Sequence, residues 1–196
     1  DIEGAAVRDM SLMSNEMHNM GIDVGQMCNI TVGRLNQAGQ QIIVHKERVA
    51  LAKLKTRKME LKRQFRCVIT VIDAFPETNT VNDMQKIDKN LFGAQYHETQ
   101  KTAMFEIKEV PKDLQEGKLP LKVVKIARNL SLDELMDLYK QGLVNWQVQN
   151  NAEDDIFAAN SVDMTRSQMF SNMKHVYWNW TKSVAQQDHY LHATNY

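Results

Sequence analysis

Residues 10–28 read MSLMSNEMHNMGIDVGQMC, and from Met10 onward apolar or small side chains recur at intervals of three or four. Side chains at this spacing share one face of an α-helix, because the helix has about 3.6 residues per turn. The series continues well beyond the quoted stretch and comprises Met10, Met13, Met17, Met20, Val24, Cys28, Thr31, Leu35, Ala38, Ile42, His45, Val49, Ala52, Thr56 and Met59. The spacing therefore predicts a long, Met-rich N-terminal helix.

Two arrangements of this helix are open. A continuous helix over residues 10–59 would be about 75 Å long and would form a coiled coil with another chain. A turn at Ala38-Gly39 would instead give a helical hairpin whose two apolar faces cover each other. The glycines favour a break, since each costs about 1 kcal/mol relative to Ala inside a helix; they are Gly21, Gly25, Gly33 and Gly39.

The apolar face of this helix is the predicted contact surface between copies of the chain. A helix of this length exceeds what a small domain can cover, so the prediction implies a homo-oligomer that also contacts other protein subunits. The expected oligomerisation residues are Met10, Met13, Met17, Met20, Val24, Cys28, Leu35, Ile42, Val49 and Met59.

The remainder of the chain has the pattern of a small α+β domain. Residues 66–75, RCVITVIDAF, form a β-branched apolar run typical of a buried strand, and residues 102–110 and 119–128 favour two further strands. A capping-box spacing before LMDLYKQ predicts a helix that ends at Gly142. Residues 162–184 favour an amphipathic C-terminal helix, with a frayed tail beyond residue 187. We divide the chain into an association segment, residues 1–64, and an α+β domain of about three strands and C-terminal helices, residues 65–196.

The composition indicates which partners and which cellular compartment to expect. Lys and Arg together number 24, as do Asp and Glu, so no overall charge draws the chain to nucleic acid or to an anionic membrane. The two cysteines form no metal-binding or disulfide pattern, and the longest apolar runs are too short to cross a bilayer. We expect a non-secreted protein of the cytoplasm or of a virion, with no membrane contact, no cofactor and no bound metal.

Residues 46–66 carry a dense run of basic side chains. A basic helix can follow a phosphate backbone, since each neutralised phosphate releases counterions, although a solvated helix face explains the same pattern. The expected polyanion-binding residues are Lys53, Lys55, Arg57, Lys58, Lys62 and Arg63. Nucleic acid is therefore an alternative partner.

Two further groups of residues suggest metal chemistry. Glu106-Ile107-Lys108, with Asp73, Asp83 or Asp88 upstream, resembles the metal-dependent nuclease pattern of a distant aspartate followed by E-x-K. In such a nuclease the carboxylates hold a divalent cation against a phosphate. The second group is Asp188-His189 with His192, and with His175 earlier in the chain; solvent-exposed histidines near the chain end explain this group equally well.

These observations support a structural or assembly protein that associates through its N-terminal helix within a larger complex such as a virion. The alternative is a nucleic-acid-binding protein that uses the basic segment, and the third hypothesis is a metal-dependent nuclease. On the leading interpretation the chain is not an enzyme and has no catalytic residues.

Overall fold

The computed structural model describes residues 6–7, 16–97, 104–109, 122–162, 164–170, 176–182 and 187–196. Within these residues a nine-stranded mixed sheet has the strand order β1-β9-β4-β3-β2-β5-β6-β8-β7. The strands are β1 (Ala6–Val7), β2 (His18–Asp23), β3 (Met27–Leu35), β4 (Gln41–Ala50), β5 (Cys67–Asp73), β6 (Leu91–His97), β7 (Phe105–Glu109), β8 (Lys122–Ala127) and β9 (Val144–Gln147).

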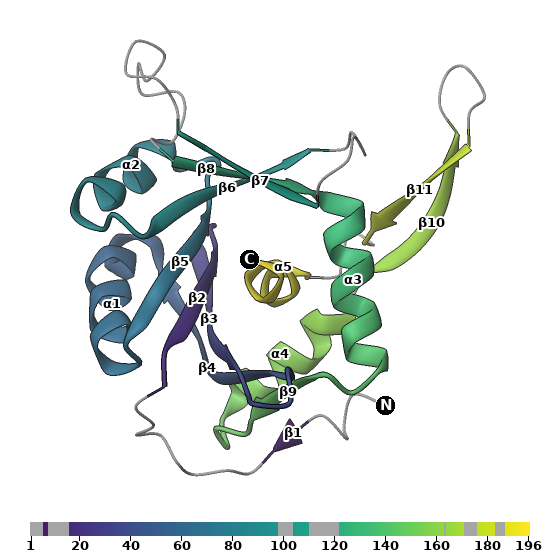
Figure 1. The fold of residues 1–196 in the computed structure, drawn as a ribbon, viewed down its shortest axis with the longest axis horizontal. Coiled ribbons are helices and arrows are strands. Elements are labelled where there is room, and N and C mark those ends of the chain that lie inside the picture. Colours follow the sequence, from purple (N-terminus) through teal and green to yellow (C-terminus); the bar gives the residue numbers. More distant parts are fainter. Residues whose placement is uncertain are drawn as a thin grey trace.

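Helices cover both faces of this sheet (Figure 1). On one face lie α1 (Leu51–Gln64) and α2 (Thr78–Ile87), and on the other lie α3 (Arg128–Lys140), α4 (Ala152–Val162) and α5 (His189–Asn195). A separate hairpin of β10 (Thr165–Phe170) and β11 (Val176–Thr181) extends from the body beside α3. The protein is therefore α/β, and the α+β class that we expected is wrong.

The predicted N-terminal helix is also wrong, whether continuous or as a hairpin. Residues 18–50 form the antiparallel strands β2, β3 and β4, and a helix begins only at Leu51. These strands lie inside a sheet that is covered on both faces, so apolar residues of both faces are buried and a spacing of three and four arises without a helix. Gly39, with φ of 79°, forms the turn between β3 and β4.

The residues expected in a helical contact surface are therefore scattered. Met20, Val24 and Cys28 are buried in the core between the sheet and α1. In contrast, Met17 and Leu35 are 68% and 70% exposed. Ile42, Val49 and Met59 are half-buried, whereas Met10 and Met13 lie outside the described residues. No single surface joins the members of this set that the structure describes, so these do not form a coiled-coil seam.

One sheet joins elements from both sides of the boundary that we placed at residue 64. Strand β5 pairs in parallel with β2, and β9 pairs in parallel with β4. The strand predicted over residues 66–75 is confirmed as β5, and those predicted over 102–110 and 119–128 are confirmed as β7 and β8. The helix predicted before Gly142 is confirmed as α3, although it begins at Arg128.

The predicted C-terminal helix over residues 162–184 is wrong, since this region contains the hairpin, in which Arg166 lies opposite Trp180. The tail beyond residue 187 forms α5 rather than a frayed end, and its Tyr190 and Leu191 are fully buried. None of the helices in the described parts of the chain is long and apolar enough to cross a membrane.

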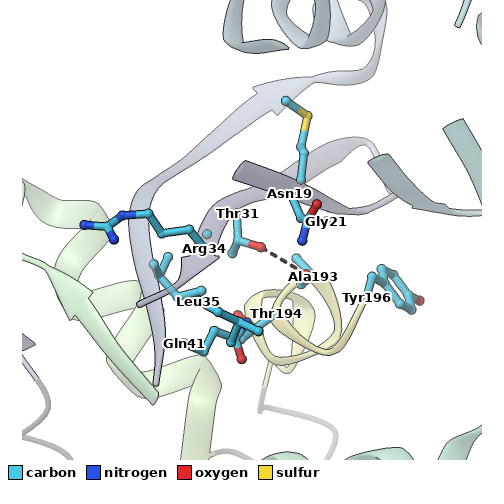
Figure 2. A pocket seen from close by; sticks show the side chains of 12 residues that line it. Asn19, Gly21, Thr31, Arg34, Leu35, Gln41, Ala193, Thr194 and Tyr196 are labelled. Carbon is cyan, nitrogen blue, oxygen red and sulfur yellow. Dashed lines mark hydrogen bonds between the residues drawn. The ribbon is translucent and has the colours of Figure 1, made fainter. Parts of the chain in front are cut away.

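Helix α5 packs directly on the centre of the sheet (Figure 2). A Cβ added to Gly21 on β2 would lie 1.9 Å from the backbone oxygen of Ala193, so only glycine permits this approach. The Thr31 hydroxyl on β3 donates a hydrogen bond of 3.0 Å to the same oxygen. A cavity of about 240 Å³ lies beside this contact and is lined by Asn19, Arg34 and Thr194 among others. The close packing fixes α5 against β2 and β3.

Candidate functional site

Two aspartates lie at the ends of neighbouring parallel strands. Asp23 ends β2 and Asp73 ends β5, and the preceding residues Ile22 and Ile72 are register partners. Each strand ends with a buried isoleucine followed by its aspartate, so the fold brings two carboxylates to one edge of the sheet. Polar residues that follow adjacent parallel strands are the usual ligand-binding groups of α/β proteins.

The surroundings of Asp73 disfavour its charged form. Burial raises the pKa of Asp73 to about 6, even though the backbone N–H of Phe75 donates a hydrogen bond of 3.1 Å to its Oδ1. The negative charge of Asp23 adds to this rise and the nearby His192 opposes it. Burial is the larger cause of the rise, and the neighbouring carboxylate of Asp23 is a smaller one that a bound cation would offset.

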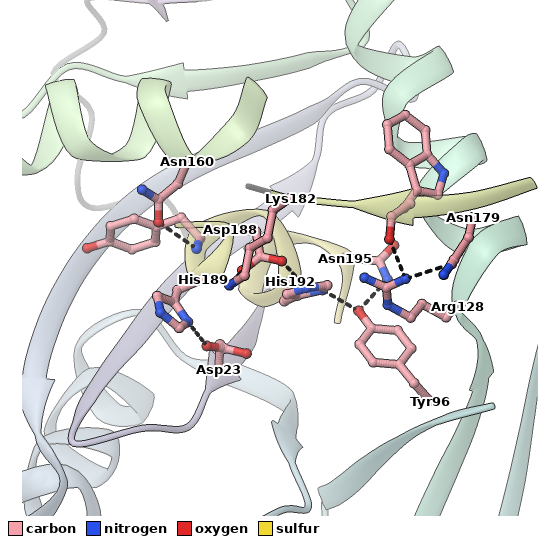
Figure 3. Close-up of polar contacts among 12 residues, drawn as sticks. Asp23, Tyr96, Arg128, Asn160, Asn179, Lys182, Asp188, His189, His192 and Asn195 are labelled. Atoms are coloured by element: carbon pink, nitrogen blue, oxygen red, sulfur yellow. Dashed lines mark hydrogen bonds and ion pairs between the residues drawn. The ribbon is translucent and has the colours of Figure 1, made fainter. Parts of the chain in front are cut away.

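The start of α5 faces these strand ends (Figure 3). The His189 imidazole lies with Nδ1 2.8 Å from Oδ2 of Asp23, and this hydrogen bond raises the pKa of His189. Asp188, which is 4% exposed, precedes the helix and forms an ion pair with Lys182. His192 lies one turn further along α5, with Nε2 3.0 Å from the second oxygen of Asp188.

Asp188 is therefore a buried carboxylate near this edge. Its burial acts to raise the pKa, but hydrogen bonds from His192 and Lys182 outweigh that effect and hold the pKa well below its usual value. Asp188 is thus charged, and two cationic or hydrogen-bonding side chains fix its position.

A further set of hydrogen bonds fixes His192 and the hairpin. The Tyr96 hydroxyl at the end of β6 lies 2.9 Å from Nδ1 of His192, and the Asn195 amide donates to the same hydroxyl over 3.0 Å. Arg128, at the start of α3, donates to the side chain of Asn179 and to the backbone oxygen of Trp180 on β11 (Figure 3). The ends of β6 and β8 therefore contribute positioning groups to the same edge.

The donor set fits a hard divalent cation. Among the residues that the structure describes, no three carboxylate, imidazole or thiol groups already converge as a complete metal site. However, Mg²⁺ is commonly held by one or two carboxylates together with waters and substrate phosphates rather than by an all-protein cage. Asp23 and Asp73 supply two carboxylates, and burial, together with the negative charge of Asp23, raises the pKa of Asp73.

The E-x-K residues lie elsewhere. Glu106 and Lys108 are on β7, separated from β5 by β6 and β8, and they pair with each other at 3.0 Å. Three strand spacings amount to about 14 Å, so these side chains do not join Asp73. Asp83 is exposed and pairs with Lys86, and Asp88 is buried against α1. Of the three upstream aspartates that we considered, only Asp73 belongs to the candidate site.

The predicted polyanion-binding residues lie on α1, which covers the opposite face of the sheet from α5 (Figure 1). Lys58 is 1% exposed and, with Lys62, binds Asp88, whereas Arg57 pairs with Glu47 and Glu60. Lys53, Lys55 and Arg63 are exposed. Half of this set is thus engaged within the protein and does not contribute to the candidate site.

Asp188, His189 and His192 were identified from the sequence, but as part of an exposed tail; His175 lies outside the described residues. Asp23 was missed, because it falls inside the stretch that we interpreted as a helix. A signal was present, since Ile22-Asp23 and Ile72-Asp73 both end apolar segments with the same Ile-Asp pair. Interpreting residues 18–23 as a strand would have placed the two aspartates at equivalent positions.

No protein-family model matches the chain, and a search of curated proteins finds no significant match. Solved structures do match. The large terminase nuclease from thermophilic phage G20c superposes with a TM-score of 0.58 at 11% identity, covering 92% of this chain and 80% of that one. The large terminase nuclease domain of a Thermus phage gives a TM-score of 0.52 at 14% identity, covering 91% and 76%. A zinc-bound structure of the first nuclease gives 0.51 at 12% identity, covering 92% and 79%.

These likenesses correct two expectations. The chain has the fold of nuclease domains, which points to an enzyme, so the expectation of a non-enzymatic protein is wrong. The interpretation as a coiled-coil structural protein is wrong for the same reason and because the N-terminal region is a sheet. At this level of identity the comparisons establish the fold: the chain has the architecture of the phage terminase nuclease domains.

Proposed function

We propose that this protein is a metal-dependent nuclease that hydrolyses phosphodiester bonds of nucleic acid at the edge formed by Asp23, Asp73 and the start of α5. The observation that carries the proposal is the placement of Asp23 and Asp73 at the ends of adjacent parallel strands, with the buried Asp188 next to His189, which contacts Asp23. The likeness to terminase nuclease domains supports the same reaction class, although fold alone does not determine activity.

Asp23 and Asp73 are the residues that would hold the cation, with Asp188, the residue before α5, close by. A bound divalent cation supplies charge neutralisation at the phosphate and lowers the pKa of a coordinated water. Carboxylate oxygens are better ligands for Mg²⁺ and Mn²⁺ than thiolates are. The expectation of a protein without metal is therefore replaced by a proposed Mg²⁺ or Mn²⁺ requirement.

The side chains around these carboxylates either position them or bind the substrate. His192 and Lys182 keep Asp188 charged and fixed, so that it does not need to reorganise when substrate arrives. His189 holds Asp23 through its Nδ1, and this hydrogen bond raises the pKa of His189 and so favours the cationic form of the ring. Arg128 ties the hairpin to the same edge, and Trp178 on that hairpin is 50% exposed and available for stacking on a base.

The natural partners in this proposal are nucleic acid and other protein subunits of a phage complex, since the matching structures are phage terminase components. The corresponding location is the cytoplasm or a virion-associated complex. Contact of nucleic acid with the exposed Lys53, Lys55 and Arg63 stays a prediction for the opposite face of the sheet.

The proposal is tested by cleavage of supercoiled plasmid, linear duplex and single-stranded DNA, with Mg²⁺, Mn²⁺ or EDTA present. Wild-type protein is expected to cleave at least one substrate only with the metal. Asp23→Asn and Asp73→Asn are each expected to lower the rate about 100-fold or more, because each removes a charge that the reaction requires. Asp83→Asn is the matched control, since Asp83 is an exposed aspartate that pairs with Lys86 outside the site.

Equal rates in EDTA and Mg²⁺, or equal losses in Asp73→Asn and Asp83→Asn, would refute the proposal. Circular dichroism of each variant shows whether the fold is retained. Calorimetric titration with Mn²⁺ provides a readout independent of cleavage, and binding is expected in wild type and Asp83→Asn but weakened in Asp73→Asn.

A further inference from the structure

Strand β7 forms an open edge of the main sheet. It pairs antiparallel with β8 on one side, and among the described residues no strand pairs with its other side. All five of its residues, Phe105–Glu109, are exposed. An exposed edge strand presents unpaired backbone N–H and C=O groups and is a template for pairing with another strand.

The hydrogen bonding to β8 determines which residues of β7 point outward. The backbone N–H of Ala127 donates to the backbone oxygen of Met104 over 2.8 Å, so the carbonyl of Met104 faces β8. Backbone groups alternate in direction along an antiparallel strand. The N–H and C=O groups of Phe105, Ile107 and Glu109 therefore face away from β8 and are available to a second strand.

The sequence of β7 is self-complementary about its centre. If FEIKE is paired with an antiparallel copy of itself about Ile107, Ile107 lies opposite Ile107 of the partner subunit, and Glu106 lies opposite Lys108 of the partner subunit. Phe105 then lies opposite Glu109 of the partner subunit. The residues with outward backbone groups, Phe105, Ile107 and Glu109, are the ones that this register places in hydrogen-bonded pairs.

We propose that two copies of this protein associate edge to edge through β7, about a two-fold axis at Ile107, to form one sheet that continues across both subunits. The occupant of the edge is a second copy rather than an unrelated peptide. In one and the same register, Glu106 and Lys108 meet opposite charges, and the outward backbone groups meet hydrogen-bonding partners. A two-fold interface has this property, since each subunit contributes the same surface.

Side chains on the two faces of β7 support this pairing. Glu106 and Lys108 occupy one face as a half-exposed ion pair, and in the dimer each would gain an oppositely charged neighbour across the axis. On the other face Phe105 and Ile107 are 62% and 58% exposed. They border an apolar cavity of about 390 Å³ that is also lined by Ile69, which is 44% exposed. The partner strand would shield this apolar surface from water.

This interface differs from the helical surface predicted from the sequence, and it does not depend on the proposed nuclease activity. Neither Glu106 nor Lys108 belongs to the candidate site. Loss of the dimer and loss of cleavage are therefore separable results.

The test is the dissociation constant of the dimer, measured by sedimentation equilibrium of the full chain over a range of concentrations. Wild type is expected to dimerise reversibly. Glu106→Lys and Lys108→Glu each place like charges opposite each other twice across the axis, and each is expected to weaken the dimer about 10-fold or more. The double exchange, Glu106→Lys with Lys108→Glu, restores opposite charges and is expected to return the constant toward the wild-type value.

A mixture of the two single variants gives the sharpest comparison. In a mixed dimer every charged pair is again opposite, so the mixture is expected to associate more tightly than either variant alone. A monomeric wild-type chain would overturn the proposal. A dimer with the same dissociation constant in all variants would also overturn it, because the subunits would then meet through another surface. Failure of the mixture to associate more tightly than its components is a third contradicting result.

Discussion

Asp188 shows how individual side chains prepare the candidate site before any ligand binds. It is buried and charged, held on one side by Lys182 and on the other by His192. His192 is in turn held by the Tyr96 hydroxyl. Such a chain of hydrogen bonds fixes the ring orientation of the histidine, as the outer partners of metal ligands do in other proteins.

Tyr96→Phe tests this positioning role. Removal of the hydroxyl leaves His192 with one fewer hydrogen bond and is expected to lower the cleavage rate by about 10-fold, while the affinity for nucleic acid stays close to that of wild type. Steady-state kinetics and a binding assay measure the two effects separately. Tyr139→Phe, which removes a buried hydroxyl beside Ser161 and away from the site, serves as the control. Identical kinetics for the two variants would contradict a specific role for Tyr96.

Glu47 gives a prediction about pH and stability. Burial acts to raise its pKa, but hydrogen bonds from His45 and Arg57 outweigh burial and lower it to about 2. A carboxyl whose pKa is lowered by folding stabilises the protein above its unfolded pKa, and this contribution is lost as the pH falls through the folded pKa. Glu47→Gln is therefore expected to cost roughly 1–3 kcal/mol at pH 7, with the difference from wild type shrinking between about pH 4.5 and 2.

Urea unfolding at several pH values measures the Glu47 effect. Glu60→Gln is the matched control, because Glu60 also pairs with Arg57 but its side chain is 52% exposed, and exposed ion pairs contribute little. If the difference between Glu47→Gln and wild type is independent of pH, the assignment of a low pKa to Glu47 is wrong.

At the scale of elements, the placement of α5 depends on Gly21. An alanine at this position would force its Cβ against the backbone oxygen of Ala193, and backbone cannot rotate away as a flexible side chain can. Gly21→Ala is expected to destabilise the fold by about 1–3 kcal/mol and to lower cleavage by displacing Asp188 and His189. Gly25→Ala is the comparison, since its added Cβ would lie 3.2 Å from Met27 O and demands a smaller shift.

Thermal denaturation and the cleavage assay together measure the effect of Gly21→Ala. Wild-type stability and wild-type cleavage in this variant would show that α5 is not held against β2 in the way described here.

Helix α4 is tied to the sheet by a buried ion pair. Lys46 on β4 is 1% exposed, and its Nζ lies 2.5 Å from Oδ1 of Asp154 and donates to the backbone oxygen of Gln147. Burial lowers the pKa of Lys46 and the Asp154 carboxylate opposes that change. Asp154→Asn would leave a buried cation without its counter-charge, and we expect a loss of about 3–5 kcal/mol in the free energy of unfolding.

Lys46→Met distinguishes loss of charge balance from loss of packing, because methionine retains much of the apolar volume without a buried charge. Its effect on urea unfolding is expected to be smaller than that of Asp154→Asn. Equal losses of unfolding free energy in the two variants would indicate that an unpaired buried charge costs no more than the lost packing.

The elements also show where sequence reasoning succeeded and where it failed. Residues 66–75 were identified as a strand because they are a short, β-branched apolar run with a clear end, and so Asp73 was found. Residues 18–50 were not, because strands covered on both faces lose the alternation that distinguishes strand from helix. Asp23 was missed for that reason alone. Asp188 was found but undervalued, since burial of the C-terminal segment depends on contacts with Gly21 and Thr31, far away in the sequence.

Across the whole molecule, three distant segments of the chain contribute to the candidate site. Strand β2 supplies Asp23, strand β5 supplies Asp73, and the residue before α5, near the other end of the chain, is Asp188. The sheet order places β2 beside β5, and the packing of α5 on β2 brings Asp188 near the same edge. The fold is shared with phage terminase nuclease domains at identities of 11–14%.

The most direct measurement is the anomalous diffraction of a crystal of the wild-type protein grown or soaked with Mn²⁺. The account predicts an anomalous peak between Asp23 and Asp73, with carboxylate oxygens of both residues at about 2.0–2.2 Å from the ion, and no such peak in Asp73→Asn. A wild-type crystal in which Mn²⁺ is bound elsewhere, while neither Asp23 nor Asp73 contacts an ion, would show that these carboxylates are not the metal site.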